Sequence, residues 1–272
     1  MKHQKMQNLK NIANEIRIEL VKLHNRSNTS HIGSEFSALD IMIELYYEVM
    51  NINPNNFSSK DRDYFILSKG HAAPALYAIL YRRGFITRQV LEAYGSNGSI
   101  LAEHPSRDIH GVDTISGSLG HGLSIGSGIA FALKNSNLKG KVYVLLSDGE
   151  CEEGSTIEAA NFAGRMNLDN IIAIIDNNEL QAYEITSNIQ NINSVKDKFR
   201  SSGWAIKTVN GHDYVKLKTV FYSTPFEVNK PLLVIANTVK GKGVKAMEGK
   251  MEWHYKSPSD FDAEKFIREL ED

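Results

Sequence analysis

The amino-acid sequence predicts an α/β protein, with a doubly wound, mostly parallel sheet and helices on both of its faces. Two short apolar runs, 142–146 and 171–175, flank a helical pattern, which is the arrangement of a βαβ unit. The strands of such a unit are parallel, so their carboxyl ends meet at one edge of the sheet. Each candidate strand is followed at once by polar residues or glycine. The candidate strands are residues 64–67, 142–146, 171–175, 204–209 and 232–236.

The helices are predicted from apolar residues spaced three and four apart, beginning with residues 6–24. The stretch 29–34 breaks this pattern, and Thr87 has the position of a helix-capping residue. A glycine-rich segment, 95–122, shows little periodicity, and a loop of this length inside a domain is usually functional. Further helices are expected at residues 37–49, 72–81, 123–133 and 260–270, with small residues in 123–133 that permit close packing. No linker interrupts the chain, so we expect residues 1–272 to form a single domain.

The composition excludes several classes of protein. Hydrophobic residues make up 42% of the chain and charged residues 23%, and the net charge of −1 gives no reason to expect nucleic acid or an anionic membrane as partner. The single cysteine, Cys151, cannot form an internal disulfide, which favours a reducing compartment. No apolar run has the length of a signal-peptide core or of the roughly 18 residues that span a bilayer. We therefore expect a cytoplasmic protein.

Asp148 and Asn178 follow the two strands of the βαβ unit directly. A carboxylate and an amide oxygen on neighbouring strand ends are hard oxygen ligands, which suits Mg²⁺ or Ca²⁺. Gly149 comes next to Asp148, so a backbone N–H can approach an anion closely there. Ligands of open α/β sheets bind at this edge, and the sequence therefore predicts a metal and a phosphate at one place.

Several of the nine histidines have unusual surroundings. His31, His71, His104 and His121 lie beside glycine or proline, and His254 lies in the segment that follows the last strand. Imidazole is the side chain that exchanges protons near neutral pH. Five loop histidines in a chain with a metal-like motif therefore favour proton-transfer chemistry.

Taken in chain order, a set of motifs resembles transketolase. The motifs are S-H-I-G (30–33), L-S-K-G-H-A (67–72), H-P (104–105), G-S-L-G-H-G-L (117–123), S-D-G-E-C-E-E-G (147–154), I-I-D-N-N (174–178) and T-V-K-G-K-G (238–243), followed by His254. The resemblance is to the N-terminal half of that family and covers essentially the whole chain. It implies a thiamine diphosphate-binding fold, of which this chain is the diphosphate-binding module. It also implies that the pyrimidine-binding half lies on a separate chain, the C-terminal subunit of a split transketolase, in an α₂β₂ assembly.

The resemblance further implies a reaction and roles for matched residues. The reaction is transfer of a two-carbon ketol unit from a ketose or its phosphate to an aldose, with thiamine diphosphate and Mg²⁺ as cofactors. The implied metal ligands are Asp148, Asn178 and the carbonyl of Leu180. The implied cofactor-binding residues are His71, Gly117, Leu119, Asp148, Gly149, Glu153, Asn178 and His254, and the implied catalytic residues are His31, His71, His104 and His254. Glu153 and Glu158 are implied to lie near the subunit interface, and Cys151 is interpreted as a small filler.

Two departures from the family pattern bear on the loops of the expected site. Ser147 replaces a glycine, and Tyr183-Glu184 stands where transketolases commonly carry Asp-Gly, which places a negative charge close to the metal-binding loop. Three alternatives stay open. The chain could belong to another thiamine diphosphate enzyme, such as a carboligase or a 2-oxoacid dehydrogenase, or be a non-catalytic scaffold subunit. A Mg²⁺-dependent hydrolase using Asp148 is the third, and it leaves the histidine set without a role.

Overall fold

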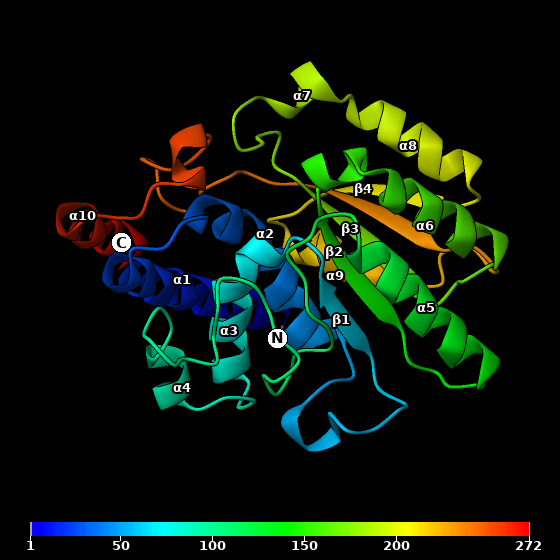
Figure 1. Cartoon of the computed structure of the whole chain (residues 1–272), viewed down its shortest axis with the longest axis horizontal. Helices are drawn as coiled ribbons and strands as arrows, with labels where there is room; N and C mark the ends of the chain where they lie inside the picture. Colours follow the sequence, from blue (N-terminus) through cyan, green and yellow to red (C-terminus); the bar gives the residue numbers. More distant parts are fainter. Residues whose placement is uncertain (1, 272) are drawn as a thin grey trace.

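The computed structural model describes residues 2–271, and a five-stranded, fully parallel sheet lies at its centre (Figure 1). The strand order is β1-β2-β3-β5-β4, so β2 and β3 are direct neighbours and β5 lies on the other side of β3. This confirms the predicted parallel α/β sheet. The strands are β1 (Tyr64–Leu67), β2 (Val142–Ser147), β3 (Ile171–Asn177), β4 (Ala205–Asn210) and β5 (Leu232–Asn237).

Alternate residues of each central strand enter two separate hydrophobic clusters, one on each face of the sheet. In β2, Tyr143 and Leu145 belong to one cluster, while Val142, Val144 and Leu146 belong to the other. Side chains point alternately to the two faces of a strand, and a sheet covered on both faces reads as a nearly continuous apolar run. All six residues of β2 are buried, which explains why the run 142–146 is so strongly apolar.

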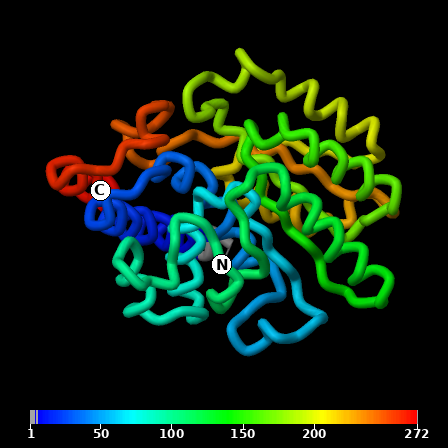
Figure 2. Tube along the Cα trace, viewed as in Figure 1, coloured from blue at the N-terminus to red at the C-terminus, as the bar shows by residue number. Residues whose placement is uncertain are grey.

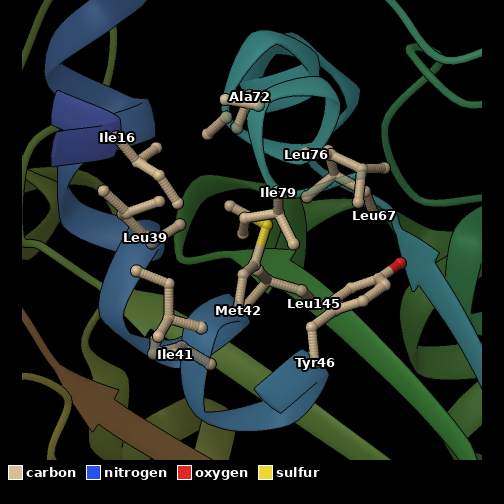
Figure 3. Packing of buried hydrophobic residues seen from close by; sticks show 14 of the residues in the cluster. Ile16, Leu39, Ile41, Met42, Tyr46, Leu67, Ala72, Leu76, Ile79 and Leu145 are labelled. Carbon is tan, nitrogen blue, oxygen red and sulfur yellow. The ribbon is translucent and has the colours of Figure 1, made fainter. Parts of the chain in front are cut away.

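The larger cluster packs the sheet against five helices (Figure 1). These are α1 (Lys2–Ser27), α2 (Ile32–Glu44), α3 (Ala73–Arg82), α9 (Tyr214–Tyr222) and α10 (Asp260–Glu271). Every residue of α2 is buried, and Figure 3 shows its Leu39, Ile41 and Met42 beside Ile79 of α3 and Leu145 of β2. Figure 2 shows α10, in red, alongside α1, in blue, so the two ends of the described chain pack together.

The smaller cluster covers the other face with α5 (Gly122–Asn135), α6 (Gly154–Arg165) and α8 (Ile192–Ser201). Helix α5 approaches the sheet very closely, because a Cβ added at Gly126 would lie 2.6 Å from Cγ2 of Val144. The small residues of the predicted helix 123–133 therefore do permit close packing, as expected from the sequence. Helix α6 connects β2 to β3 and completes the predicted βαβ unit.

Short helical turns connect the main elements. Helix α4 (Arg88–Glu92) begins as predicted at Thr87, whose hydroxyl oxygen accepts a hydrogen bond from the backbone N–H of Val90. The other short segments are η1 (Leu45–Val49), η2 (Pro54–Asn56), η3 (Gly70–Ala72), α7 (Thr186–Ile189), η4 (Gly149–Glu152) and η5 (Met251–His254). Three of these, η3, η4 and η5, carry residues of the predicted site.

The second helix differs from its predicted bounds of 37–49. It begins five residues earlier, at Ile32, and continues beyond Glu44 as the π-helical turn η1. The reason is the backbone of His31, which adopts a left-handed conformation with φ of 79° and so turns the chain directly into α2. Such a conformation is uncommon for a residue with a Cβ, and its sequence signal is weak. Within residues 2–271, no helix is both long and apolar enough to cross a membrane.

Candidate functional site

The polar segments that follow β1, β2, β3 and β5 gather at the carboxyl edge of the sheet. The register of β2 and β3 pairs Ser147 with Asp176, so Asp148 and Asn178 leave neighbouring strands at nearly the same level. A cavity of about 410 Å³ opens there. Each residue that the sequence singles out for the metal, the cofactor or catalysis lines it: His31, His71, His104, Gly117, Leu119, Asp148, Gly149, Glu153, Asn178, Leu180 and His254.

The carboxylate of Asp148 is held by three donors. The backbone N–H of Gly149 lies 2.8 Å from Oδ1, while the backbone N–H of Glu179 and the hydroxyl of Thr186 lie 3.0 and 2.8 Å from Oδ2. Burial raises the pKa of the Asp148 carboxyl above its ordinary value, and the hydrogen bond from Thr186 opposes this shift. The result is a rigid, buried carboxylate without a cation in direct contact, which is a favourable place for a metal ion.

Asn178 presents its amide oxygen on the same side as Leu180, whose backbone N–H donates to it at 3.1 Å. The amide nitrogen points the other way and donates to Asp176 Oδ2 at 3.3 Å. Asp148, Asn178 and the Leu180 carbonyl thus supply one carboxylate, one amide oxygen and one backbone oxygen. No cluster of three His, Cys, Asp or Glu ligands occurs within residues 2–271. Mg²⁺ commonly uses one or two carboxylates together with phosphate oxygens, so the donor set fits Mg²⁺ with a diphosphate.

Two buried lysines lie at this edge, and neither has a role predicted from the sequence. Lys69 follows β1 and is ion-paired with Asp176 at 2.5 Å, with both side chains fully buried. Lys240 follows β5 and donates to the Leu180 carbonyl at 3.2 Å and to His254 Nδ1 at 2.8 Å. Within residues 2–271, no carboxylate lies within ion-pair distance of Lys240. Burial and the nearby Lys69 lower the pKa of Lys240 to about 8, and a bound anion would relieve this repulsion.

Three imidazoles form a contiguous cluster beside these lysines. The ring of His31 lies 5.1 Å from that of His71 and 4.9 Å from that of His254, measured between centroids. The backbone fixes the arrangement, because the N–H of His31 donates to the His254 carbonyl at 2.9 Å. These residues come from three distant parts of the chain, at the start of α2, in η3 and in η5.

Burial and positive neighbours lower the pKa of every member of this cluster. The pKa of His31 falls to about 4, with burial as the main cause and His104 next. The pKa of His254 falls to about 3 through burial and the charge of Lys240, and that of His71 lies well below its ordinary value for the same kind of reason. At neutral pH the three rings are therefore uncharged and able to accept a proton.

His104 approaches the cavity from the long loop 95–122. Its ring lies against Gly117, where an added Cβ would be 2.7 Å from the ring, and the φ of Gly117 is 134°. Glycine is therefore required at this position both by the backbone and by the contact with the imidazole. The loop is held on the protein by Tyr77, whose hydroxyl donates to the carbonyls of Ala102 and His104.

The two departures from the family pattern are accommodated without strain on the loops. The Ser147 hydroxyl oxygen accepts a hydrogen bond from the backbone N–H of Glu150 at 3.2 Å, and so caps η4. Glu184 does not line the cavity: its carboxylate accepts from the backbone N–H of Ile185 at 2.7 Å and from the Asn188 side chain. The expectation that Glu184 places its charge near the metal-binding loop is thereby revised, since that charge is held at the start of α7.

The remaining candidates differ in position. Glu153 is exposed and lines the cavity, whereas Glu158 is exposed on α6 and does not line it. Cys151 is fully buried, burial raises the pKa of its thiol well above the ordinary value, and its sulfur donates to the Ser147 carbonyl. A protonated, inaccessible thiol is unreactive, as expected for a small filler.

Comparison with known proteins gives a consistent result. Residues 8–268 match the family described as "Transketolase, thiamine diphosphate binding domain". The chain is 39% identical over 254 residues to one subunit of the apulose-4-phosphate transketolase of Phocaeicola vulgatus, covering 93% of this chain and 90% of that one. It is 34% identical over 247 residues to a 6-deoxy-6-sulfo-D-fructose transketolase subunit of a Clostridium species, covering 90% of each.

The matches to full-length transketolases cover only part of those proteins. Human transketolase is 34% identical over 268 residues, which is 98% of this chain and 42% of that protein. The crystal structure of transketolase from Campylobacter jejuni superimposes with a TM-score of 0.92 at 29% identity, covering 97% of this chain and 43% of that one. The chain therefore belongs to the transketolase family, in which it corresponds to the thiamine diphosphate-binding domain.

Proposed function

We propose that this chain is the N-terminal, thiamine diphosphate-binding subunit of a transketolase, active together with a separate partner chain. The pair transfers a two-carbon ketol unit from a ketose, or its phosphate, to an aldose acceptor. The observation that carries the proposal is the cavity at the carboxyl edge of the sheet, where a buried carboxylate–amide pair, two buried lysines and a cluster of neutral imidazoles converge.

The residues present fit a diphosphate with its magnesium ion. Asp148, Asn178 and the Leu180 carbonyl are the proposed metal ligands, because they combine hard oxygen donors in one place. Lys240, His71, His254 and the backbone N–H of Gly149 are proposed to face the diphosphate, where Lys240 would gain the anionic partner that it lacks. Gly117 and the backbone of Leu119 are proposed to contact the aminopyrimidine.

When bound, the cofactor supplies a nucleophilic carbon and an electron sink for the two-carbon fragment. The chain's own residues then orient the sugar and move protons. His31, His104 and His254 are proposed to take protons from sugar hydroxyls and to return them, and the low pKa values of His31 and His254 keep those rings ready to accept. The buried Lys69–Asp176 pair holds β1 and β3 together beneath these groups.

A partner chain is needed because the cavity is open on one side. The relatives from P. vulgatus and the Clostridium species are named as subunits, and this chain spans nearly their whole length. We propose a partner subunit that binds the pyrimidine, in a two-fold α₂β₂ assembly, the usual way in which such pairs associate. Glu153 at the cavity and Glu158 on α6 are proposed to lie near the interface with the partner.

The test is to reconstitute the chain with its partner and to assay a panel of ketose donors with aldose acceptors. The panel contains xylulose 5-phosphate, fructose 6-phosphate, apulose 4-phosphate and 6-deoxy-6-sulfofructose. Mass spectrometry of the products should show a gain of two carbons on the acceptor, dependent on thiamine diphosphate and Mg²⁺. Products formed by joining a decarboxylated 2-oxoacid would instead identify another carboligase, and cofactor binding without any turnover would identify a scaffold subunit.

A further inference from the structure

Two tyrosines that have no structural task line the mouth of the cavity. The side chains of Tyr183 and Tyr255 are strongly exposed, with 75% and 66% of the surface of these residues open to solvent. Within residues 2–271, neither phenol hydroxyl has a hydrogen-bond partner. Large aromatic side chains exposed together beside a cavity, rather than scattered singly, are typical of surfaces that bind a ligand.

The position of Tyr255 is fixed relative to the imidazole cluster. Its ring packs edge-on against His254, at 4.7 Å between centroids, and lies 6.0 Å from the ring of His31. His31 and His254 are partly buried, while Tyr255 extends beyond them into solvent. A molecule whose reacting carbons lie at the two imidazoles must therefore pass Tyr255 on its way out of the cavity.

Tyr183 is brought to the same mouth by a tight turn. The backbone N–H of Gln181 donates to the Glu184 carbonyl at 3.0 Å, which places Tyr183 within the turn. Lys240 ties this turn to the segment of Tyr255, because its ammonium donates both to the carbonyl of Gln181, at 3.4 Å, and to His254 Nδ1. Lys240 is itself buried, so the two tyrosine-bearing loops are held together from below.

The chemistry of the mouth identifies what it can bind. The charged side chains that line the cavity are Lys69, Asp148, Glu152 and Glu153, and Lys69 is already paired with Asp176. This chain therefore offers no available cation at the mouth for a terminal phosphate. Tyrosine rings offer apolar faces for C–H groups, and their free hydroxyls can bond to alcohols. A neutral polyol chain, in which C–H and O–H groups alternate, has both of these features.

We propose that Tyr255, together with Tyr183, determines specificity for the ketose donor by binding its carbon chain beyond C3. The inference rests on the proposed function and adds to it the part of the substrate that this chain recognises. The reacting carbons lie at the imidazoles, the middle of the sugar chain lies against the tyrosines, and any terminal charged group lies beyond them. Substitutions of Tyr255 change the affinity for long donors, and the chemical step is carried by other residues.

The experiment compares donors with and without a sugar chain on the complex of this chain with its partner subunit. The donors are fructose 6-phosphate, xylulose 5-phosphate and 3-hydroxypyruvate, which carries the ketol unit but no sugar chain. Tyr255→Ala should raise the ratio of the KM for the better ketose to the KM for 3-hydroxypyruvate about tenfold, which corresponds to about 1.4 kcal/mol. Tyr183→Ala should change the same ratio in the same direction by a smaller factor.

Two further variants separate the causes. Tyr255→Phe retains the ring and should keep most of the ratio if C–H contacts dominate. Phe261→Ala removes an aromatic residue that is 77% exposed on α10 and does not line the cavity, so its ratio should equal that of the parent. An unchanged ratio in Tyr255→Ala, or a loss confined to kcat, would overturn the inference while leaving the proposed function intact. A parent complex that turns over none of the three donors would overturn both.

Discussion

His104 shows how a single residue is positioned for proton transfer. Its ring occupies the space beside Gly117, and its backbone carbonyl accepts a hydrogen bond from the Tyr77 hydroxyl at 3.1 Å. The loop that carries it contains no regular helix or strand, so these two contacts fix where the imidazole lies. The ring can therefore act on a substrate without contributing to the metal or diphosphate positions, which lie at the ends of β2 and β3.

Replacing His104 with alanine should lower the turnover of the reconstituted enzyme by about 10²-fold, the usual scale for a positioned acid or base. Cofactor affinity should change little, because His104 lies apart from Asp148 and Lys240. Steady-state kinetics and calorimetric titration with thiamine diphosphate measure the two effects. His110→Ala is the matched control, since His110 lies in the same loop but packs against Phe57 and Phe85. Normal turnover with lost cofactor binding would contradict this assignment.

The imidazole cluster also makes stability depend on pH. The pKa of His31 is about 4 and that of His254 about 3 in the folded chain, against the ordinary 6.5. Between these values and 6.5 the unfolded chain binds more protons than the folded chain, so the free energy of unfolding falls as the pH is lowered through this window. Above about pH 7 both states carry neutral rings, and this contribution to the pH dependence disappears.

Urea unfolding of the isolated chain at several pH values from 7 down to 4.5 should therefore show a progressive loss of stability. His254→Gln should reduce the slope of this loss, because one of the depressed imidazoles is removed. His121→Gln, which changes an exposed histidine at the start of α5, should leave the slope as it is. Equal slopes in the parent and in His254→Gln would contradict the account.

The single residues of the site were accessible to sequence reasoning to different degrees. Asp148, Asn178 and the histidines were found because motifs and strand ends identify them. Lys69 and Lys240 stand inside the same motifs but were missed, since a sequence does not reveal that a lysine is buried beside a cavity rather than solvated. The interpretation of Glu184 failed for a related reason: the direction of its side chain depends on the turn that precedes α7.

Among the elements, α5 depends most directly on the size of its residues. Gly126 faces Val144 of β2, whereas nothing lies within 4 Å of a Cβ placed at Gly128, two residues further along the same helix. The two glycines therefore form a matched pair, in which the same substitution meets a packed surface in one case and open space in the other.

Gly126→Ala should destabilise the chain by about 1–3 kcal/mol, because the added methyl group pushes α5 away from the sheet. Gly128→Ala should stabilise it by up to about 1 kcal/mol, because alanine favours the helix and meets no neighbour. Urea unfolding of the two variants measures both values. Similar effects of the two substitutions would show that α5 does not approach β2 as described.

Regular elements were predicted well where a strong period or a known cap marks them. Helices α1, α3, α5 and α10, the cap at Thr87 and all five strands lie within a few residues of their predicted positions. The start of α2 was missed because it depends on the left-handed backbone of His31, a conformation that local sequence barely signals. The short turns η3 and η4 also escaped prediction, although they carry site residues.

For the whole molecule, the open side of the cavity determines what the chain can do alone. A cofactor held at this edge would have much of its surface in water, so its affinity for the isolated chain should be poor. We expect no transketolase activity from the isolated chain and a stable complex with a partner of roughly 300 residues. Native mass spectrometry of the mixture should give an α₂β₂ mass. Sugar turnover by the purified chain alone, with no partner detected, would refute this expectation.

The most direct test of the account is calorimetric titration of thiamine diphosphate into the complex of the two chains, with Mg²⁺ or with EDTA. The parent complex should bind the cofactor only with Mg²⁺, and Asp148→Ala should abolish this binding while circular dichroism shows an intact fold. Asp197→Ala, the same substitution at an exposed position on α8, should bind as the parent does. Undiminished Mg²⁺-dependent binding by Asp148→Ala would place the metal elsewhere and contradict the central claim.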